Sequence, residues 1–323
     1  MKTAIVGLGV IGHVHYDVLK NMGAEIVALC DVDLSKIENF DGCNKYENYL
    51  EMLEKECLDV VHICTPHYLH ADMIIEALER GVNVLCEKPL CIKEEDIERI
   101  LEAENKSSAI LGVCHQNRYN AENKFVKEYI KDKNVKGALG NMVWQRTEEY
   151  YRSGDWRGKW QTEGGGVLIN QALHTLDLLI WFVGEPDSVS SSITNHRLKG
   201  VIEVEDTANI IASGKSNFTF FGTNSSSVNF PVYITIAADD EYILVYSPKV
   251  IVGDKEYNFE KDKRIYGKCC YGNGHDGLIK EFYDSIKKGE KFWIDGKEAS
   301  KVIKLILSVY KQNNLKGEEN QCK

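Results

Sequence analysis

The first 117 residues alternate short apolar runs with helix-like segments, and this alternation is the strongest constraint on the fold. The apolar runs are continuous, which predicts strands that are buried on both faces. Such strands, separated by amphipathic helices, are typical of a parallel, doubly wound α/β sheet. We expect strands at "TAIVGLG", "EIVALCD", "LDVVHICT", "VNVLCEK" and "AILGVCH", and helices over 13–22, 46–55, 68–80 and 94–106.

The pattern changes after Arg118. One amphipathic helix, over 121–133, precedes long strands of alternating polarity, at "GNMVWQRTEEYY", "TANIIASG", "NFTFFGTNS", "VYITIAAD" and "EYILVYS". Such strands, joined by turn signals, predict a mainly antiparallel sheet with one open face. Two further helices, over 275–288 and 298–313, end the pattern. The sequence therefore predicts a doubly wound α/β domain over 1–118 and an α+β domain over 119–323.

The open face of the second sheet predicts self-association. Apolar side chains recur along its strands, and two terminal helices are too few to cover them all; we take as examples Val143, Ile210, Ile211, Phe220 and Ile234. A large bare apolar face rarely stays exposed in a folded protein. We therefore expect a homodimer or homotetramer that is joined sheet to sheet.

Charge and cysteine usage narrow the function classes. The chain of 323 residues has a net charge of −10, which disfavours nucleic acid or an anionic membrane as the main partner. No apolar run approaches the ~20 residues that a membrane helix needs. Several of the ten cysteines lie inside apolar strands, as reduced thiols in a cytoplasmic protein do. Cys269 and Cys270 have no second pair at zinc spacing, so no metal site is expected.

A glycine pattern stands between the first strand and the first helix. Gly7, Gly9 and Gly12 form G-x-G-x-x-G, and Asp31 closes the second strand. These glycines permit a tight turn, the approach of a pyrophosphate and close helix packing, while the helix N-terminus binds phosphate. Asp31 is placed to accept hydrogen bonds from the ribose hydroxyls of an adenosine. The spacing predicts a dinucleotide site, and the carboxylate favours NAD over NADP.

Polar residues follow three successive strands of the predicted parallel sheet. These are Thr65 and Pro66 in "CTPHYLH", Glu87 and Lys88 in "NVLCEKPL", and Gln116 with Asn117. Ligands of such sheets lie beyond the carboxyl ends of the strands. A surface ion pair would not usually end a buried strand, so we expect Glu87 and Lys88 to have functional roles, with Lys88 donating to a substrate oxygen.

A second group of candidates lies in "TEGGGVLINQALHTLDLLIWFVG", residues 162–184. Three glycines precede an apolar helix that would carry Asn170, His174 and Asp177 at i, i+4 and i+7. An imidazole titrates near neutral pH, which suits proton exchange with an alcohol, whereas Asp177 would anchor the helix. From the preceding loop, "EYYRSGDWRGKWQ", we expect substrate contacts by Tyr151, Trp156 and Arg157.

Together these motifs resemble the glucose–fructose oxidoreductase, inositol dehydrogenase and rhizopine catabolism (Gfo/Idh/MocA) family. The matching pieces are "GLGVIG", "TPHYLH", "EKP", "GGGVLINQALHTLD" and "GHDGLIKEFYDSI". The resemblance implies a Rossmann domain, an oligomerising α/β domain and reversible oxidation of a secondary alcohol on a sugar or cyclitol. The cofactor would lie against Gly7, Gly9, Val10, Ile11, Gly12, Asp31, Thr65, Pro66, His70, Glu87, Lys88 and Asn117.

The resemblance also implies roles for three residues in the reaction. Lys88 would contact nicotinamide and substrate, and His174 would act as the acid/base. Many family members carry aspartate where this chain has Asn170, and an asparagine cannot share the proton. The proton would then fall to His174, Lys88 or a tyrosine such as Tyr151.

Two other functions fit the same residues. A lyase or glycosidase of the family would use NAD transiently, oxidising the sugar and then reducing it again. A sugar-sensing protein would keep the fold for binding alone, although the presence of Lys88 and His174 favours an enzyme.

Overall fold

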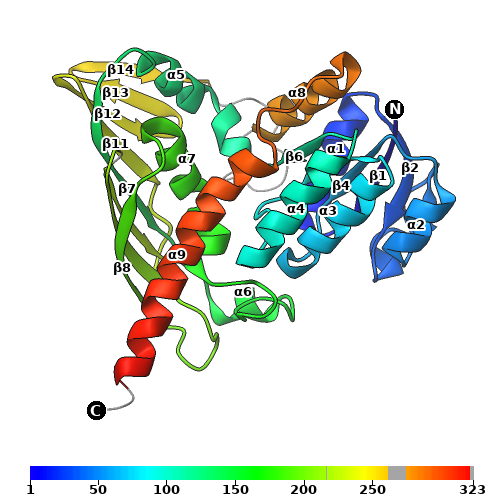
Figure 1. The fold of residues 1–323 in the computed structure, drawn as a ribbon, viewed down its shortest axis with the longest axis horizontal. Helices are drawn as coiled ribbons and strands as arrows, with labels where there is room; N and C mark the ends of the chain where they lie inside the picture. The colour runs from blue at the N-terminus through cyan, green and yellow to red at the C-terminus, as the bar shows by residue number, and fades with distance from the viewer. Residues whose placement is uncertain (216, 261–273, 321–323) are drawn as a thin grey trace. The chain divides into compact units, whose positions relative to one another are not determined.

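The computed structural model describes residues 1–215, 217–260 and 274–320 (Figure 1). The chain forms two compact units: Met1–Tyr119 with Asp262–Ser300, and Asn120–Lys261 with Lys301–Lys323. The predicted boundary at 118/119 differs from this division in one respect, because the chain returns to the first unit near its end. Cys269 and Cys270, which entered the prediction that the protein has no metal site, lie outside the described residues.

The first unit contains a six-stranded sheet in the order β3-β2-β1-β4-β5-β6. All neighbouring strands are parallel, so the predicted doubly wound sheet is confirmed. The order reverses between β1 and β4, which is where ligands of such sheets bind. The strands are β1 (Lys2–Val6), β2 (Glu25–Cys30), β3 (Asn44–Tyr46), β4 (Val60–Ile63), β5 (Asn83–Cys86) and β6 (Leu111–Val113).

Helices cover both faces of this sheet, because successive parallel strands are joined by right-handed crossovers. The helix α1 (Val10–Asn21) packs with α8 (Gly274–Lys288), while α2 (Tyr49–Lys55), α3 (His70–Glu79) and α4 (Glu94–Lys106) pack with one another (Figure 1). Short 3-10 turns lie at Leu34–Lys36, His67–Leu69 and Gln116–Tyr119. Three acidic residues in the first turn of α4 match the positive end of its dipole, and the predicted bounds agree with those observed.

The segment that returns to the first unit completes its core. A Cβ on Gly112 would lie 2.7 Å from Phe282 of α8 and 2.9 Å from Phe292, so β6 needs glycine there. The Val113 amide also donates to the Ile294 carbonyl oxygen at 3.0 Å. Residues 274–300 therefore belong with the nucleotide-binding sheet, although sequence order predicts them in the second domain.

The second unit contains an eight-stranded sheet in the order β14-β13-β12-β11-β7-β10-β9-β8. Among the described strands of this sheet, β7 and β10 pair in parallel and the other neighbours pair antiparallel, so the predicted mainly antiparallel sheet is also confirmed. The strands are β7 (Val135–Val143), β8 (Ser188–Thr194), β9 (Thr207–Ser213), β10 (Phe218–Thr223), β11 (Tyr233–Ala238), β12 (Glu241–Tyr246), β13 (Lys249–Val252) and β14 (Lys255–Asn258).

One face of this sheet is covered within the unit. The helix α7 (Leu173–Val183) packs on β7 and β10, and α5 (Ala121–Tyr129) packs on β12 and β13 (Figure 1). The long helix α9 (Gly296–Asn320) ends the described chain. Of the residues predicted for the open face, Ile210, Phe220 and Ile234 are instead buried on the covered face. Their neighbours carry the exposed positions, because side chains alternate along a strand.

The open face still carries an apolar row. Leu139 is 52% exposed and Ile211 is 56% exposed. Both pair with Thr219, Leu139 from β7 and Ile211 from β9, so they lie in one lateral row of the sheet. Val143 is half-buried. The apolar side chains on the open face therefore include Ile211, which is among the predicted examples, and Leu139, which is not.

Local structure departs from the predicted pattern in a few places. The segment "TEEYY" forms the short helix α6 (Glu148–Arg152) rather than the end of a strand. Acidic Glu148 and Glu149 occupy its first turn, which favours the positive end of a helix dipole. No helix among the described residues has the length and apolar character to cross a membrane. Cys30, Cys64, Cys86 and Cys114 are buried free thiols, as their apolar settings predict.

Candidate active site

The turn after β1 is built for close approach of the backbone. Gly7 has φ +86°, and a Cβ there would lie 2.6 Å from the Cys64 carbonyl oxygen, beyond the end of β4. A Cβ on Gly12 would lie 2.0 Å from the Gly7 carbonyl oxygen. Gly9 differs, because a Cβ there would meet nothing within 4 Å. Two glycines are thus required by packing, and the third leaves open space at the start of α1.

The start of α1 and the end of β2 fit a dinucleotide. No side chain caps α1, so the amides near Val10 and Ile11 can donate to phosphate. Asp31 is buried; it accepts from the Leu8 amide at 2.7 Å and from the Asp33 amide at 2.9 Å. Its carboxylate is therefore tied to the glycine turn and can still accept a ribose hydroxyl.

Lys36 also reaches Asp31, and sequence reasoning missed this contact. Its Nζ lies 3.2 Å from Oδ1 of Asp31, and its side chain is 44% exposed. A carboxylate has about four acceptor positions, and Leu8, Asp33 and Lys36 take three of them. A second ribose hydroxyl therefore requires Lys36 to move. The signal in the sequence is a lysine five residues after the aspartate.

His70 contacts the loops that follow β4 and β5 and links them. This buried ring lies 2.9 Å from the Thr65 carbonyl oxygen and 2.6 Å from the Pro89 carbonyl oxygen. Both ring nitrogens therefore face carbonyl groups of the protein. We expect His70 to position the loops that carry Thr65, Pro66 and Lys88, rather than to contact the cofactor directly.

Glu87 lies inside the first unit rather than on its surface. The Nε2 atoms of His15 and His275 lie 3.0 and 3.2 Å from its Oε1. Its Oε2 accepts from the Lys88 amide at 3.2 Å. Burial alone would raise the pKa of Glu87, but hydrogen bonds from His15 and His275 hold it well below the ordinary value. Glu87 is thus a buried carboxylate that fixes the backbone of Lys88.

Further hydrogen bonds extend inward from His15. Its Nδ1 lies 2.7 Å from Nδ1 of His62, and Nε2 of His62 lies 3.0 Å from the Tyr283 hydroxyl. Burial lowers the pKa of His15 and lowers that of His62 further, so both rings are neutral at neutral pH. Because ionised Glu87 can only accept, His15 carries its proton on Nε2. His62 then donates from Nδ1, and Tyr283 donates to His62.

The second unit holds Asn170 and His174 on one irregular helix. Leu168–Ala172 forms a π-turn that runs into α7, and such turns are frequent at functional sites. The Asn170 Nδ2 donates to Oε1 of Glu163, and it lies 3.3 Å from the Tyr150 hydroxyl. The amide orientation is assigned from this contact, with Nδ2 as the donor. His174 is half-buried, and Asp177 is buried, as expected for a helix anchor.

Two of the three glycines before this helix are required by close packing. A Cβ on Gly165 would lie 2.0 Å from the Tyr310 hydroxyl, and one on Gly166 would lie 1.9 Å from the Glu205 carbonyl oxygen. Glu205 caps the turn, accepting from the Gly166 and Leu168 amides at 2.9 and 3.0 Å. Burial raises its pKa to about 7. The glycines therefore set the start of the helix that carries Asn170.

Two neighbouring tyrosines have different environments. Tyr151, predicted to contact substrate, is 5% exposed and packs with Leu198, Ile202 and Val204. Its hydroxyl lies 3.2 Å from Nδ2 of Asn224, so its role in this structure is in packing. Tyr150 instead reaches Asn170, and its hydroxyl also accepts from Gln171 at 3.0 Å and from Arg157 at 2.6 Å.

Glu163 and Tyr150 are therefore the candidates that sequence reasoning missed in this unit. Arg157 and Trp156, both predicted to contact substrate, stack on one another, with the guanidinium carbon 4.5 Å from the Trp156 ring centre. The feature of the sequence that could have indicated Glu163 is its position directly before three glycines. The sequence predicts only a chain break there, because the contact depends on the fold of the loop.

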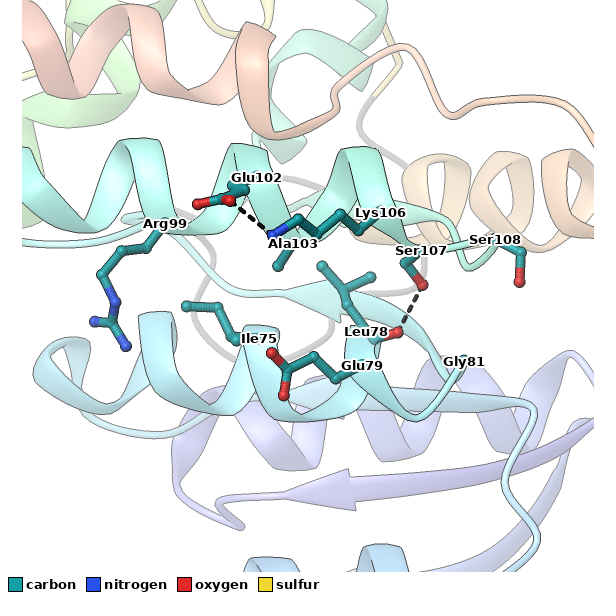
Figure 2. A pocket seen from close by; sticks show the side chains of 10 residues that line it. All are labelled: Ile75, Leu78, Glu79, Gly81, Arg99, Glu102, Ala103, Lys106, Ser107 and Ser108. Carbon is teal, nitrogen blue, oxygen red and sulfur yellow. Dashed lines mark hydrogen bonds and ion pairs between the residues drawn. The ribbon is translucent and has the colours of Figure 1, made fainter.

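Neither described cavity coincides with the predicted residues as a group. The larger, of about 550 Å³, lies between α3 and α4 and reaches Gly81 and Ser107 at their C-terminal ends (Figure 2). Those ends face the amino ends of the strands, opposite to the edge where dinucleotides bind. A smaller cavity of about 210 Å³ in the second unit is bordered by Tyr151, Arg157 and Lys159, among others.

Comparison with known proteins defines the class of protein to which this chain belongs. Residues 1–115 match the profile described as "Oxidoreductase family, NAD-binding Rossmann fold", and residues 128–243 match the GFO/IDH/MocA C-terminal domain. These matches place the chain among oxidoreductases with an NAD-binding Rossmann domain, which confirms the cofactor prediction. The chain belongs to the GFO/IDH/MocA family, as its motifs predict.

Relatives with known names are distant. Inositol 2-dehydrogenase of Salmonella typhimurium is 28% identical over 232 residues, which cover 65% of this chain and 65% of that protein. D-glucoside 3-dehydrogenase of Escherichia coli is 27% identical over 197 residues, or 58% of this chain and 55% of the relative. The matched region thus spans less than two thirds of these relatives.

A solved structure matches over a larger share of the chain. The WlbA dehydrogenase of Chromobacterium violaceum, in complex with NADH and UDP-GlcNAcA, has a TM-score of 0.85 and 27% identity. The match covers 96% of this chain and 92% of WlbA. The similarity therefore extends through both units.

Proposed function

We propose that this protein is an NAD-dependent oxidoreductase that acts on a secondary alcohol of a sugar, sugar derivative or cyclitol. The observation that carries the proposal is the fit of the first unit to a dinucleotide. Gly9 leaves open space before the uncapped start of α1, and the Asp31 carboxylate is tied to the same turn. Membership of the family supports the reaction class, and the named relatives support a sugar-like substrate.

In the proposed reaction the residues of the chain bind, orient and exchange a proton. When bound, NAD supplies a hydride acceptor at the nicotinamide C4. Lys88 donates to the hydroxyl oxygen and stabilises its developing negative charge. His174 takes the hydroxyl proton at a ring nitrogen. The Nδ2 of Asn170 is directed to Glu163, and its Oδ1 accepts a hydrogen bond from a neighbouring hydroxyl of the substrate.

Residues around Lys88 would act by positioning it. Glu87 holds the Lys88 amide, and His70 holds the carbonyl group of the next residue, Pro89. The lysine backbone is therefore fixed on both sides. In this proposal Glu87 and His70 fix the backbone on either side of the lysine, and of these three residues Lys88 contacts the substrate.

An NAD-reduction screen over cyclitols, aldoses, sugar acids and nucleotide sugars tests the reaction. With an active substrate, His174→Ala should lower turnover by about 10² to 10⁴, the usual range for general acid–base catalysis. NADH affinity should not change, because His174 belongs to the second unit. The matched control is His196→Ala, which removes an exposed histidine of the same unit.

The outcomes separate the rival functions. NADH that accumulates with a simple sugar or cyclitol supports a dehydrogenase. Bond cleavage or elimination without net NADH would favour the lyase or glycosidase. NAD binding without turnover of any compound would favour a binding protein, and near-normal activity of His174→Ala would remove His174 from the mechanism.

We also propose that the protein is cytoplasmic and forms dimers or tetramers through the open face of the second sheet. The exposed apolar row that includes Leu139 and Ile211 supports the assembly. The buried free thiols in the first unit support a reducing compartment.

A further inference from the structure

Tyr150 lies between two arginines. The guanidinium carbon of Arg157 lies 4.5 Å from the ring centre of Tyr150, and that of Arg146 lies 5.2 Å from it. Each arginine also stacks on a tryptophan, Arg157 on Trp156 at 4.5 Å and Arg146 on Trp144 at 5.0 Å. Aromatic faces hold a guanidinium in place without neutralising its charge. The arrangement therefore concentrates fixed positive charge in a chain whose net charge is −10.

The two arginines retain donors that other side chains do not use. Arg146 donates to the Gln145 carbonyl oxygen at 2.8 Å, and Arg157 donates to the Tyr150 hydroxyl at 2.6 Å. The Nε atom of each is buried and meets no acceptor among the described residues. Neither arginine forms an ion pair within the described part of the chain. Buried charged donors without acceptors are costly unless a ligand satisfies them.

Among the described residues, one acidic side chain accompanies the two arginines at the Tyr150 hydroxyl. Glu163 is the acidic residue that influences the Tyr150 hydroxyl, and it accepts from the Asn170 amide and the Gly158 amide. Two arginines thus accompany one carboxylate. The surplus positive charge would be balanced by a single additional anionic group. Guanidinium groups bind carboxylate and phosphate well, because their planar N–H donors match those anions.

The position of this cluster relates it to the proposed reaction. Asn170 donates to the Tyr150 hydroxyl, and Gln171 donates to it from the next position of the same helix. Four positions further along the helix from Asn170 stands His174. An anion held beside Tyr150 would therefore lie near the residues proposed to orient and deprotonate the alcohol.

We propose that the substrate is an anionic sugar, and that Arg146 and Arg157 bind its negatively charged group. The inference rests on the proposed function, because it names the substrate class for that reaction. A carboxylate, as in a free or nucleotide-linked uronic acid, balances the charge of the cluster with one group. The WlbA dehydrogenase, which is 27% identical, was crystallised with UDP-GlcNAcA. A sugar phosphate shares the chemistry, so the test includes both sources of charge.

The test compares substrates that differ only in charge. Glucose and glucuronate differ by a carboxylate, and so do UDP-GlcNAc and UDP-GlcNAcA; glucose 6-phosphate adds a phosphate instead. We expect the carboxylate member of a pair to have at least a tenfold higher kcat/KM. A preference for every phosphate-bearing sugar, with no effect of the carboxylate, would identify phosphate as the group that is bound.

Variants assign the preference to the two arginines. Arg146→Gln and Arg157→Gln should each raise KM for the preferred anion by about 10- to 100-fold, the effect of losing a charged hydrogen bond. The preference for the member of each pair that carries the carboxylate should fall in both variants, while the affinity for NADH should change little. Arg152→Gln is the matched control, because Arg152 is an exposed arginine of the same segment, paired with Glu148. Calorimetric titration of the protein–NADH complex with glucuronate and UDP-GlcNAcA gives a readout that does not require turnover.

The results separate this inference from the proposed function. Equal use of neutral and anionic members, with turnover intact, would overturn the anionic substrate and leave the oxidoreductase standing. A purely structural role predicts that Arg157→Gln lowers the melting temperature and affects neutral and anionic sugars alike, which would also overturn it. If no sugar is oxidised and neither anion binds the protein–NADH complex, both proposals fail.

Discussion

His15 Nε2 lies 3.0 Å from Oε1 of Glu87, and this contact sets the direction of a buried hydrogen-bonded chain. The carboxylate can only accept, so each neutral ring donates toward it: His62 to His15, and His15 to Glu87. At the far end, the Tyr283 hydroxyl lies 2.8 Å from Oγ1 of Thr3. One ionised side chain therefore determines the tautomers of two histidines across three neighbouring elements, α1, β4 and β5.

We expect this buried series of hydrogen bonds to make the stability of the protein depend on pH. Burial, followed by the proximity of His15, holds the pKa of His62 well below its ordinary value of 6.5. The unfolded chain binds a proton as the pH falls below about 6.5, whereas the folded protein keeps the ring neutral. Stability is therefore present above that pH and is lost as the pH falls.

Melting temperatures between about pH 7.5 and 5.5 measure this effect. His62→Gln keeps a donor toward His15 and should show a shallower fall in melting temperature than the native protein. His196→Gln, which changes an exposed histidine, should keep the native slope. Equal slopes for all three proteins would show that His62 does not titrate on unfolding.

Metal removal gives a second prediction. The ligand atoms of His15, Glu87 and His275 lie within 4.8 Å of one another, a spacing that a metal ion could use. Both histidine N–H groups are, however, already directed to the carboxylate, and a metal would require those protons to leave. We expect dialysis against EDTA to leave the melting temperature unchanged. Stoichiometric zinc in the purified protein, with a lower melting temperature after its removal and in His275→Gln, would assign a metal site here.

The sequence predicts the elements better than the contacts between them. Five strands of the first unit are recognisable because they are apolar runs, and α4 because its first turn is acidic. The strand β3 is not predicted, because its sequence, NKY, is polar and largely exposed. His62 lies within the apolar run "VVHI", where the pattern indicates only burial. Its pairing with His15, 47 residues away, depends on how α1 packs against the sheet. No local pattern carries that information.

The sequence of the second unit likewise predicts its strands better than their contacts. Alternation predicts two faces for each strand but does not decide which face the helices cover, so it does not show that Ile210 and Phe220 lie on the covered face. Residues 274–300 follow the second sheet in sequence and yet complete the first unit. The choice depends on Phe282 and Phe292 fitting against Gly112, a contact between distant segments.

The contact between Lys36 and Asp31 predicts the effect of mutation on cofactor preference. Asp31→Asn removes the carboxylate that accepts from ribose and should weaken NADH binding by about tenfold or more. The same change releases Lys36, which can then pair with a 2′-phosphate, so NADPH affinity should rise. The double variant Asp31→Asn/Lys36→Ala should lose that gain. Fluorescence titration of the native protein and both variants with each cofactor measures these affinities, and unchanged NADH affinity in Asp31→Asn would exclude Asp31 from the site.

The exposed side chains on the open face of the second sheet predict that a single substitution can dissociate the proposed assembly. Leu139 lies in the middle of the exposed row, with Thr219 and Thr235 as its lateral neighbours. A lysine there would place a charge within the proposed interface, so Leu139→Lys should reduce the assembly to a smaller species. Val228→Lys changes an exposed apolar residue outside the strands and should have no effect. Sedimentation velocity at micromolar concentration measures the oligomeric state of all three proteins. A monomeric native protein would contradict the proposed assembly.

Asn170 and Glu163 give the sharpest test of how this chain differs from its family. Asn170→Asp would restore the residue that many members carry, but here it would place a second carboxylate against Glu163. Asn170 is 9% exposed and Glu163 is 1% exposed, so water would screen the repulsion poorly. We expect the unfolding free energy to fall by roughly 2–4 kcal/mol at neutral pH.

The loss should depend on pH with a defined sign. Two buried carboxylates in contact share a proton, so one of them has a raised pKa in the folded state. The stability that Asn170→Asp loses relative to the native protein is then smallest at low pH and grows as the pH rises through that pKa. The double variant Asn170→Asp/Glu163→Gln exchanges the two groups, since the introduced glutamine can donate to the introduced carboxylate while its oxygen still accepts from the Gly158 amide. It should recover most of the melting temperature at neutral pH. If Asn170→Asp is as stable as the native protein at alkaline pH, or if the exchange restores nothing, then the contact between Asn170 and Glu163 is not what determines the residue at position 170.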